Sequence, residues 1–119
     1  MNNHGKQAEE LANHYLQKQN LKLIAQNYHC RRGEIDLIME DQQTLVFIEV
    51  RYRKNARFGS PLESVDHRKQ AKIITTAEHY LLQNTQHYSG YRFDVVAIMP
   101  TQNSGQPEIS WIKNAFQLN

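Results

Sequence analysis

The sequence has little of what several common protein classes require. Its single cysteine, Cys30, excludes an intramolecular disulfide and a cysteine-based zinc site, and it suits a reducing compartment. None of the 6 histidines has the spacing of a zinc motif such as HExxH. No glycine-rich loop follows a strand-like run, which argues against the familiar modes of nucleotide binding. No apolar run reaches membrane-spanning length, and the polar start MNNHGKQAEE lacks a signal-peptide core. We therefore expect a cytoplasmic protein with no membrane partner.

The length and charge set only broad limits. A chain of 119 residues is large enough for one core and too short for two, so we expect a single domain over residues 1–119. The 14 basic and 12 acidic side chains give a net charge of +2, which by itself says little about partners.

Hydrophobic periodicity predicts two helices and five strands. The expected order is a helix at Gly5–Gln19, strands at Leu21–Cys30, Glu34–Glu40 and Leu45–Arg51, a helix from His67 to about Asn84, and strands at Tyr91–Met99 and Glu108–Lys113. Two candidate caps precede the second helix. One is the capping box Ser60-Pro61-Leu62-Glu63, and the other is Asp66.

The stretch GEIDLIMEDQQTLVFIEVRYR, residues 33–53, predicts a hairpin on which the rest of the fold is built. Its loop holds either Gln42 and Gln43 or the four residues Asp41–Thr44. Both loops give the same pairs, which are Glu40 with Leu45, Ile38 with Phe47, Asp36 with Glu49, and Glu34 with Arg51. Because successive side chains of a strand point to opposite faces, one side of the hairpin is expected to be apolar, and it consists of Ile35, Leu37, Met39, Val46, Ile48 and Val50. We expect the second helix to cover that side, and the other side to carry the charges.

Two acids face each other on the charged side of this hairpin. The Cβ atoms of Asp36 and Glu49 would lie roughly 4.5–5.5 Å apart, as in directly opposed residues of an antiparallel ladder. Two like charges there need a shared proton, a cation from the chain or a bound metal. Hard cations such as Mg²⁺ and Mn²⁺ favour carboxylate oxygens. Arg51 projects from the same side and stays protonated, so its expected task is to hold a negative oxygen.

Simpler explanations exist for each of these residues. The hairpin face could be ordinary solvated surface, with Arg51 paired to Glu34 and shared with Asp36. Glu9 lies near the start of the first helix, where the helix dipole favours negative charge without any catalytic role. Paired carboxylates also serve glycosidases, but those sites need wider separations and an aromatic sugar cleft, which a small chain with a basic flank fits poorly.

Basic residues concentrate directly after the acidic pair. Between positions 51 and 72 there are seven, against Glu63 and Asp66. Besides Arg51 they are Arg53, Lys54, Arg57, Arg68, Lys69 and Lys72. Such a segment would attract a polyanion and deliver it to the paired acids, which makes these six residues candidate nucleic-acid contacts. A solvated charge cluster is the alternative.

Several segments of the sequence resemble a known family. GKQAEELANHYL, QNYHCRRGEIDLIMED, LVFIEVRYR, RFGSP, KQAKI and RFDVV look like the YraN family, the UPF0102 group, over about Gly5 to Met99. That family is similar to archaeal Holliday-junction resolvases of the PD-(D/E)XK nuclease superfamily. The resemblance implies an α/β fold with a mixed sheet, namely a restriction-endonuclease-like αβββαβ core with a short extra C-terminal strand. It also admits a homodimer, because resolvase-like relatives work as dimers.

The resemblance assigns roles position by position. Asp36 and Glu49 match the metal-binding acids of the superfamily, and Val50 would offer its backbone carbonyl. Glu9 matches a glutamate on the first helix of the family, which makes it a candidate third ligand. Lys69 matches a lysine at the start of the second helix and is expected to contact phosphate.

Arg51 is the departure, because the superfamily motif has lysine there. Arginine can steady the charge on phosphate, whereas its larger planar head suits the positioning of an attacking water less well. The leading hypothesis is a Mg²⁺- or Mn²⁺-dependent nuclease acting on DNA, branched or otherwise structured, with Asp36, Glu49, Arg51 and Glu9 at its centre. The alternatives are a module that binds metal and nucleic acid without cutting, and a scaffold that binds a protein partner.

Overall fold

A computed structural model describes residues 3–53, 64–84, 88–99 and 105–117. The elements are α1 (Asn3–Lys18), β1 (Lys22–Cys30), β2 (Gly33–Asp41), β3 (Thr44–Tyr52), α2 (His67–Gln83), β4 (Gly90–Met99) and β5 (Glu108–Phe116). The strands form one five-stranded sheet in the order β1-β2-β3-β4-β5, in which β3 and β4 are parallel and the other neighbours antiparallel. The predicted mixed α/β fold with a helix, three strands, a helix and further strands is confirmed. In the part of the chain described, no helix is both long and apolar enough to cross a membrane.

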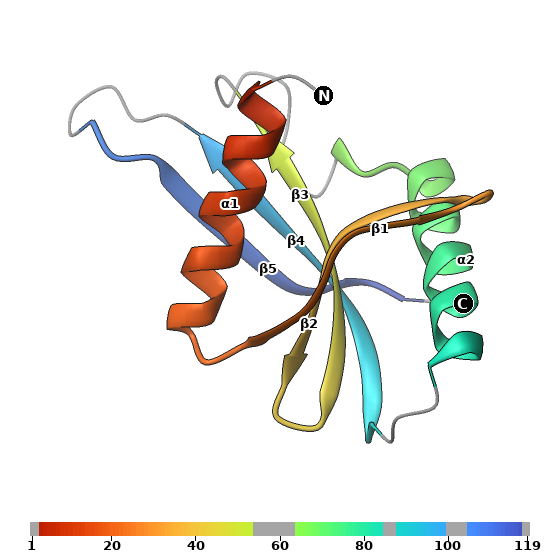
Figure 1. The fold of residues 1–119 in the computed structure, drawn as a ribbon. Coiled ribbons are helices and arrows are strands. Elements are labelled where there is room, and N and C mark those ends of the chain that lie inside the picture. Colours follow the sequence, from red (N-terminus) through yellow and green to blue (C-terminus); the bar gives the residue numbers. More distant parts are fainter. Residues whose placement is uncertain (1–2, 54–63, 85–87, 100–104, 118–119) are drawn as a thin grey trace.

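Both faces of the sheet are buried, each by one helix (Figure 1). Leu37, Met39, Val46 and Ile48 pack against Ala8, Ala12 and Leu16 of α1. On the opposite face Ile38, Leu45 and Phe47 pack against Ile73, Ala77 and Tyr80 of α2. The expectation that α2 covers the side with Leu37 and Ile48 is therefore wrong. Central strands of a sheet between two helices need apolar side chains on both faces. The hairpin therefore does not have one charged face along its whole length.

The hairpin register is correct near the turn and ends earlier than predicted. Ile38 pairs with Phe47 and Glu40 with Leu45, around a two-residue turn of Gln42 and Gln43 in which Gln42 has φ 59°. The paired stretch runs from Asp41 and Thr44 to Leu37 and Ile48. The predicted pairs Asp36 with Glu49 and Glu34 with Arg51 lie beyond it and do not form part of the ladder.

Past that point β2 follows β1 away from β3 and toward α2 (Figure 1). Gly33 begins β2 in close contact with the helix: a Cβ built on it would lie 2.9 Å from Thr76 Oγ1, and its φ of +156° is at the edge of what other residues adopt. The glycine thus lets the β2 backbone approach α2, at the end of β2 that no longer pairs with β3.

The start of α2 shows which predicted cap is used. Asp66 is the N-cap, and its Oδ1 accepts a hydrogen bond of 2.9 Å from the backbone N–H of Lys69. The capping box at residues 60–63 lies outside the described residues. At the other end of the chain, β5 extends to Phe116 and not only to Lys113.

A buried polar network fastens β5 to the centre of the sheet. Asp94 is fully buried and accepts hydrogen bonds from Arg92 Nε at 3.0 Å, Trp111 Nε1 at 2.9 Å and the backbone N–H of Asn114 at 2.8 Å. Arg92 also donates to Asp41 at 3.1 Å, at the end of β2. One carboxylate therefore links β4 and β5, and through Arg92 it reaches the hairpin turn.

We predict that Asp94→Asn lowers the free energy of unfolding by about 3–5 kcal/mol, because it leaves the half-buried Arg92 without its nearest anion and turns amide hydrogens toward donors. Asp41→Asn is the matched control, with an expected loss of about 1 kcal/mol since its side chain is partly exposed. Urea denaturation followed by circular dichroism measures both. Equal losses would show that the network is not centred on Asp94.

Candidate active site

Carboxylates from three elements meet where β2 and β3 separate. Asp36 on β2 is 9% exposed and Glu49 on β3 is 5% exposed. The Asp36 Oδ2 atom accepts a hydrogen bond of 2.8 Å from the backbone N–H of Val50. Glu9 reaches the same place from α1, where its carboxylate interacts electrostatically with Asn27, Asp36 and Glu49. The structure thus brings together Glu9, Asp36 and Glu49, although the last two are not a ladder pair.

Burial makes this cluster electrostatically unusual. The pKa of Asp36 rises to about 8, first because burial disfavours the charged form and next because of the charge on Glu49. Burial also raises the pKa of Glu9, which the hydrogen bond from Asn27 opposes. At neutral pH the cluster therefore holds a proton or needs a cation.

Two basic side chains already reach Glu49. Arg51 Nη1 lies 3.3 Å from Glu49 Oε2, and Lys69 Nζ lies 3.5 Å from the same oxygen. Arg51 also donates to Ser64 Oγ at 3.2 Å through Nε and to the Ser64 carbonyl at 3.1 Å through Nη2. The solvated-face explanation is wrong for the acids, because both are buried. Arg51 pairs with Glu49 and Ser64, and not with Glu34 and Asp36.

The helix-dipole explanation for Glu9 also fails. Because α1 begins at Asn3, the first turn of the helix contains no acidic residue, and Glu9 comes later. The dipole effect falls off within the first turn. The position of Glu9 is better explained by its contacts with Asn27 and Asp36.

The donor chemistry of the cluster fits a hard divalent cation. Mg²⁺ is usually held by one or two carboxylates, with waters and substrate oxygens in the other positions, and Asp36 with Glu49 supply such a pair. Among the residues that the structure describes, no group of three or more acidic, histidine or cysteine side chains is arranged to hold a metal ion. Glu9 as a third ligand and the Val50 carbonyl as a fourth stay predictions.

A basic hollow opens beside the acids at the start of α2. It has a volume of about 320 Å³, and its lining residues are Arg51, Ser64, Asp66, Arg68, Lys69 and Lys72. Three of the six predicted nucleic-acid contacts therefore lie together. Arg53 comes directly after β3, where its backbone N–H donates to Ile98 at 2.9 Å, while Lys54 and Arg57 lie outside the described residues.

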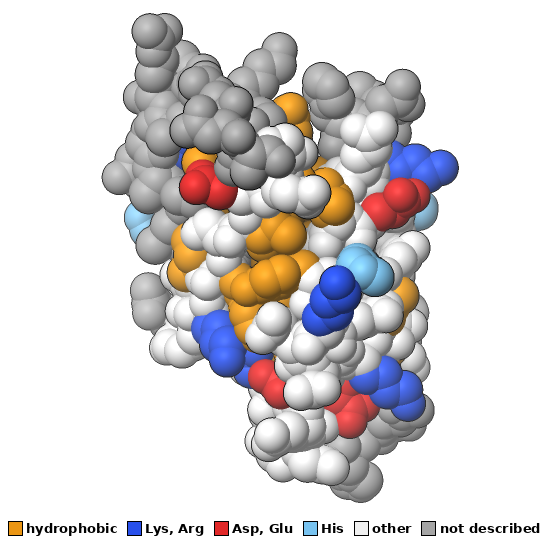
Figure 2. All heavy atoms as spheres, turned by 90° about the vertical axis from the view of Figure 1, so that its left-hand side faces the viewer, with side chains coloured by type: hydrophobic (Ala, Val, Ile, Leu, Met, Phe, Trp, Pro, Cys, Tyr) orange, Lys and Arg blue, Asp and Glu red, His pale blue; other side chains and the backbone are white. Residues whose placement is uncertain are grey.

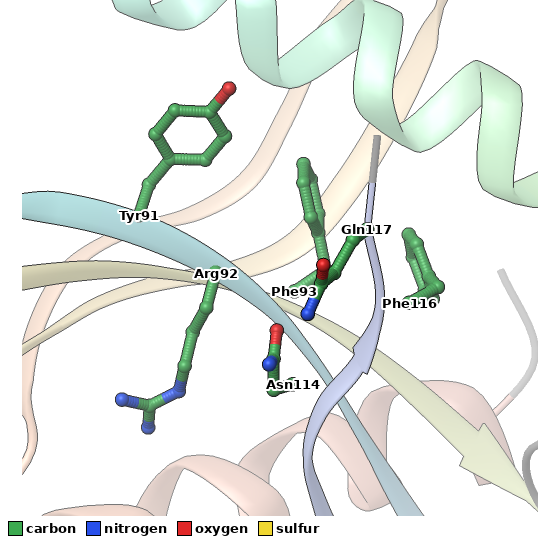
Figure 3. Close-up of a pocket in the computed structure, with 6 residues that line it drawn as sticks. All are labelled: Tyr91, Arg92, Phe93, Asn114, Phe116 and Gln117. Carbon is green, nitrogen blue, oxygen red and sulfur yellow. The ribbon is translucent and has the colours of Figure 1, made fainter. Parts of the chain in front are cut away.

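A larger hollow, of about 530 Å³, lies elsewhere, between the start of β4 and the end of β5 (Figure 3). Its lining residues are Tyr91, Arg92, Phe93, Asn114, Phe116 and Gln117. They include no acid, and Arg92 is occupied by Asp94 and Asp41. The larger hollow is therefore separate from the carboxylate cluster.

The side of the molecule with α1 and β5 has a different character (Figure 2). Apolar side chains gather at its centre, and in the described part the charged ones are spread around them. Tyr15 of α1 meets Trp111 of β5 edge to face at 6.3 Å, and Lys113 Nζ lies 4.5 Å above the Trp111 ring. The clustering of basic side chains at the start of α2 is not repeated here.

Sequence reasoning missed two residues that shape the site. Asn27 has φ 52° within β1 and lowers the pKa of Glu9, against the effect of burial. The tolerance of asparagine for positive φ is a signal, but only a weak one within a strand-like run. Ser64 holds Arg51 through both its side chain and its carbonyl, and no local pattern marks it.

We predict that, in buffer that contains a metal chelator, the free energy of unfolding of the native chain falls relative to that of Asp36→Asn as the pH rises from 5 to 8. The folded pKa of about 8 lies above the unfolded value, so unfolding releases a proton in this window and the stability falls as pH rises. The expected extra loss is about 1–3 kcal/mol. Urea denaturation at each pH measures it. Parallel pH profiles would show that Asp36 is not held protonated.

Comparison with known proteins identifies the family. The model of the family described as "Uncharacterised protein family UPF0102" matches residues 8–98. A UPF0102 protein of Psychromonas ingrahamii is 56% identical over 116 residues, which cover 98% of this chain and 91% of the relative. UPF0102 proteins of Saccharophagus degradans and Nitrosococcus oceani are 53% and 51% identical, covering 99% and 96% of this chain and 96% and 91% of their own lengths. The chain belongs to the UPF0102 family.

Proposed function

We propose that this chain is a Mg²⁺- or Mn²⁺-dependent nuclease that hydrolyses phosphodiester bonds in DNA, with branched or otherwise structured DNA as its substrate. Membership of UPF0102 establishes the family and names no reaction. The support comes from the site and from the resemblance of its motifs to the PD-(D/E)XK nucleases.

One observation carries the proposal, namely two buried acids that Arg51 and Lys69 connect to a basic hollow through Glu49. Burying Asp36 against Glu49 is unfavourable for folding, as the raised pKa of Asp36 shows. A purely structural cluster would gain from replacing Asp36 with a neutral residue. Acids kept in such a position are typical of sites that bind a cation or move a proton.

The residues divide the work between them. Asp36 and Glu49 would hold the cation, with Glu9 and the Val50 carbonyl completing its protein ligands. A divalent cation, if held there, would supply Lewis acidity and would make a coordinated water more acidic. Arg51 fixes the position of Glu49, since it contacts that carboxylate at 3.3 Å.

The basic hollow would hold the DNA backbone next to the acids. Arg68 and Lys72 are exposed and line the hollow together with the half-buried Lys69. Arginine and lysine side chains that contact phosphate position a duplex without reading its sequence. The residues at this surface therefore favour recognition of DNA shape.

A second candidate function is a module that binds metal and nucleic acid without cutting. It is favoured by Arg51, whose Nε, Nη1 and Nη2 atoms are all engaged with Ser64 and Glu49. These contacts leave two of the five guanidinium N–H donors for a phosphate, and they hold Arg51 to Glu49 and Ser64. Turnover by the native chain distinguishes the two candidates.

We predict that the purified chain cleaves at least one of duplex, single-stranded, flap and four-way DNA in Mn²⁺, and that Asp36→Asn reduces the rate about 100-fold or more, because a cation ligand is lost. Glu78→Gln on the exposed side of α2 is the matched control and keeps the native rate. Gel electrophoresis of end-labelled DNA measures both. An Asp36→Asn protein as active as the native one would refute the proposal.

We predict that Arg68→Gln and Lys72→Gln each weaken DNA binding in Ca²⁺ and reduce the slope of log affinity against log salt concentration by about 1, because each removes one phosphate contact. Lys18→Gln, in the exposed last turn of α1, serves as the control and leaves the slope unchanged. Fluorescence anisotropy at several salt concentrations gives the slopes. Unchanged slopes in both hollow variants would place the DNA elsewhere.

A further inference from the structure

Lys69 occupies a defined place in the site. Its ammonium lies 3.5 Å from Glu49 Oε2, and its side chain is 41% exposed. The backbone N–H of Lys69 donates to the N-cap side chain of Asp66, so the contact that begins α2 also fixes the lysine. Lys69 therefore reaches Glu49 from a helix, while Arg51 reaches it from the same strand.

The two basic residues differ in their freedom to meet a phosphate. Arg51 is held by three hydrogen bonds, one to Glu49 and two to Ser64. The ammonium of Lys69 has three N–H donors, and Glu49 is its one ion-pair partner among the described residues. Lys69 also lines the basic hollow with Arg68 and Lys72. A phosphate in the hollow next to Glu49 would meet Lys69 without breaking any contact of Arg51.

We infer that Lys69 supplies the ammonium that acts on the attacked phosphate, in the place that the nuclease motif gives to a strand lysine, and that Arg51 is a positioning residue. This inference rests on the proposed nuclease function and names the group within it that touches the substrate. With Lys69 in this role, Arg51 in place of the motif lysine would no longer argue against turnover.

The chemical role follows from the hydrolysis itself. A water oxygen forms a bond to phosphorus while the bond to the leaving sugar oxygen breaks. The water loses one proton to solvent, and the leaving oxygen gains one. Negative charge grows on the non-bridging phosphate oxygens in between, and a fixed ammonium stabilises it. A compact point charge suits this place better than a planar guanidinium that Ser64 already holds.

The test restores the ammonium chemically. In a Cys30→Ser background, Lys69→Cys is expected to lower kcat on the DNA that the native chain cleaves by about 100–1000-fold, as for the loss of one charge-stabilising donor. Alkylation with 2-bromoethylamine converts the cysteine into a lysine analogue and is expected to restore most of the activity. Lys22→Cys, on the exposed edge strand β1, is the matched control and keeps full activity before and after alkylation.

Two further measurements separate this role from a structural one. Calorimetric titration of Lys69→Cys with Mn²⁺ is expected to give binding as tight as native or tighter, because one cation near Glu49 is removed. The variant Lys72→Cys is expected to raise KM more than it lowers kcat, since that lysine is further along α2 and serves binding. Arg51→Lys loses its contacts with Ser64 and is expected to cleave no faster than the native chain.

The outcomes are distinct. If the native chain cleaves and Lys69→Cys cleaves equally well, the inference is wrong while the proposed function stands. If alkylation restores nothing although Mn²⁺ binding is native, the loss of activity does not come from the missing ammonium and the inference is again wrong. If only Arg51→Lys cleaves DNA, the native chain is a binding module, and both the inference and the proposed function fail.

Discussion

The separation of β2 from β3 beyond Leu37 and Ile48 is the constraint on which the site depends. Within the ladder, the backbone groups of the two strands hydrogen-bond with each other. Past the ladder, the backbone N–H of Val50 donates to the carboxylate of Asp36. A side chain thus takes the place of a backbone partner, because a buried N–H must be satisfied. The strands can then diverge, which opens the space that Glu9 and Glu49 share with Asp36.

The cluster that results is electrically asymmetric. Glu49 has cations of its own chain within 3.5 Å, from Arg51 and Lys69. The pKa of Asp36 is raised instead, first by burial and then by the charge on Glu49, and the hydrogen bond from the Val50 N–H only partly opposes this rise. One carboxylate therefore has cationic neighbours, while Asp36 tends to keep a proton.

The sequence was sufficient for the fold class, the hairpin register near its turn, and the convergence of Asp36 with Glu49. It did not predict which face of the hairpin α2 covers. Ile38 and Phe47 were expected on the charged side, but charged residues occur on that side only toward the strand ends, and both residues are buried like their neighbours. It also failed beyond Leu37, where the approach of β2 to α2 ends the pairing. Register and burial there are set by tertiary contacts, which no local pattern encodes. The contacts of Ser64 and Asn27 have the same origin.

The acids come from positions 9, 36 and 49, and the cations from 51 and 69. No single helix or hairpin contains the whole set, so a nascent or partly unfolded chain does not bring these side chains together. If the chain cuts DNA, its activity would therefore require the complete fold, with both helices packed on the sheet.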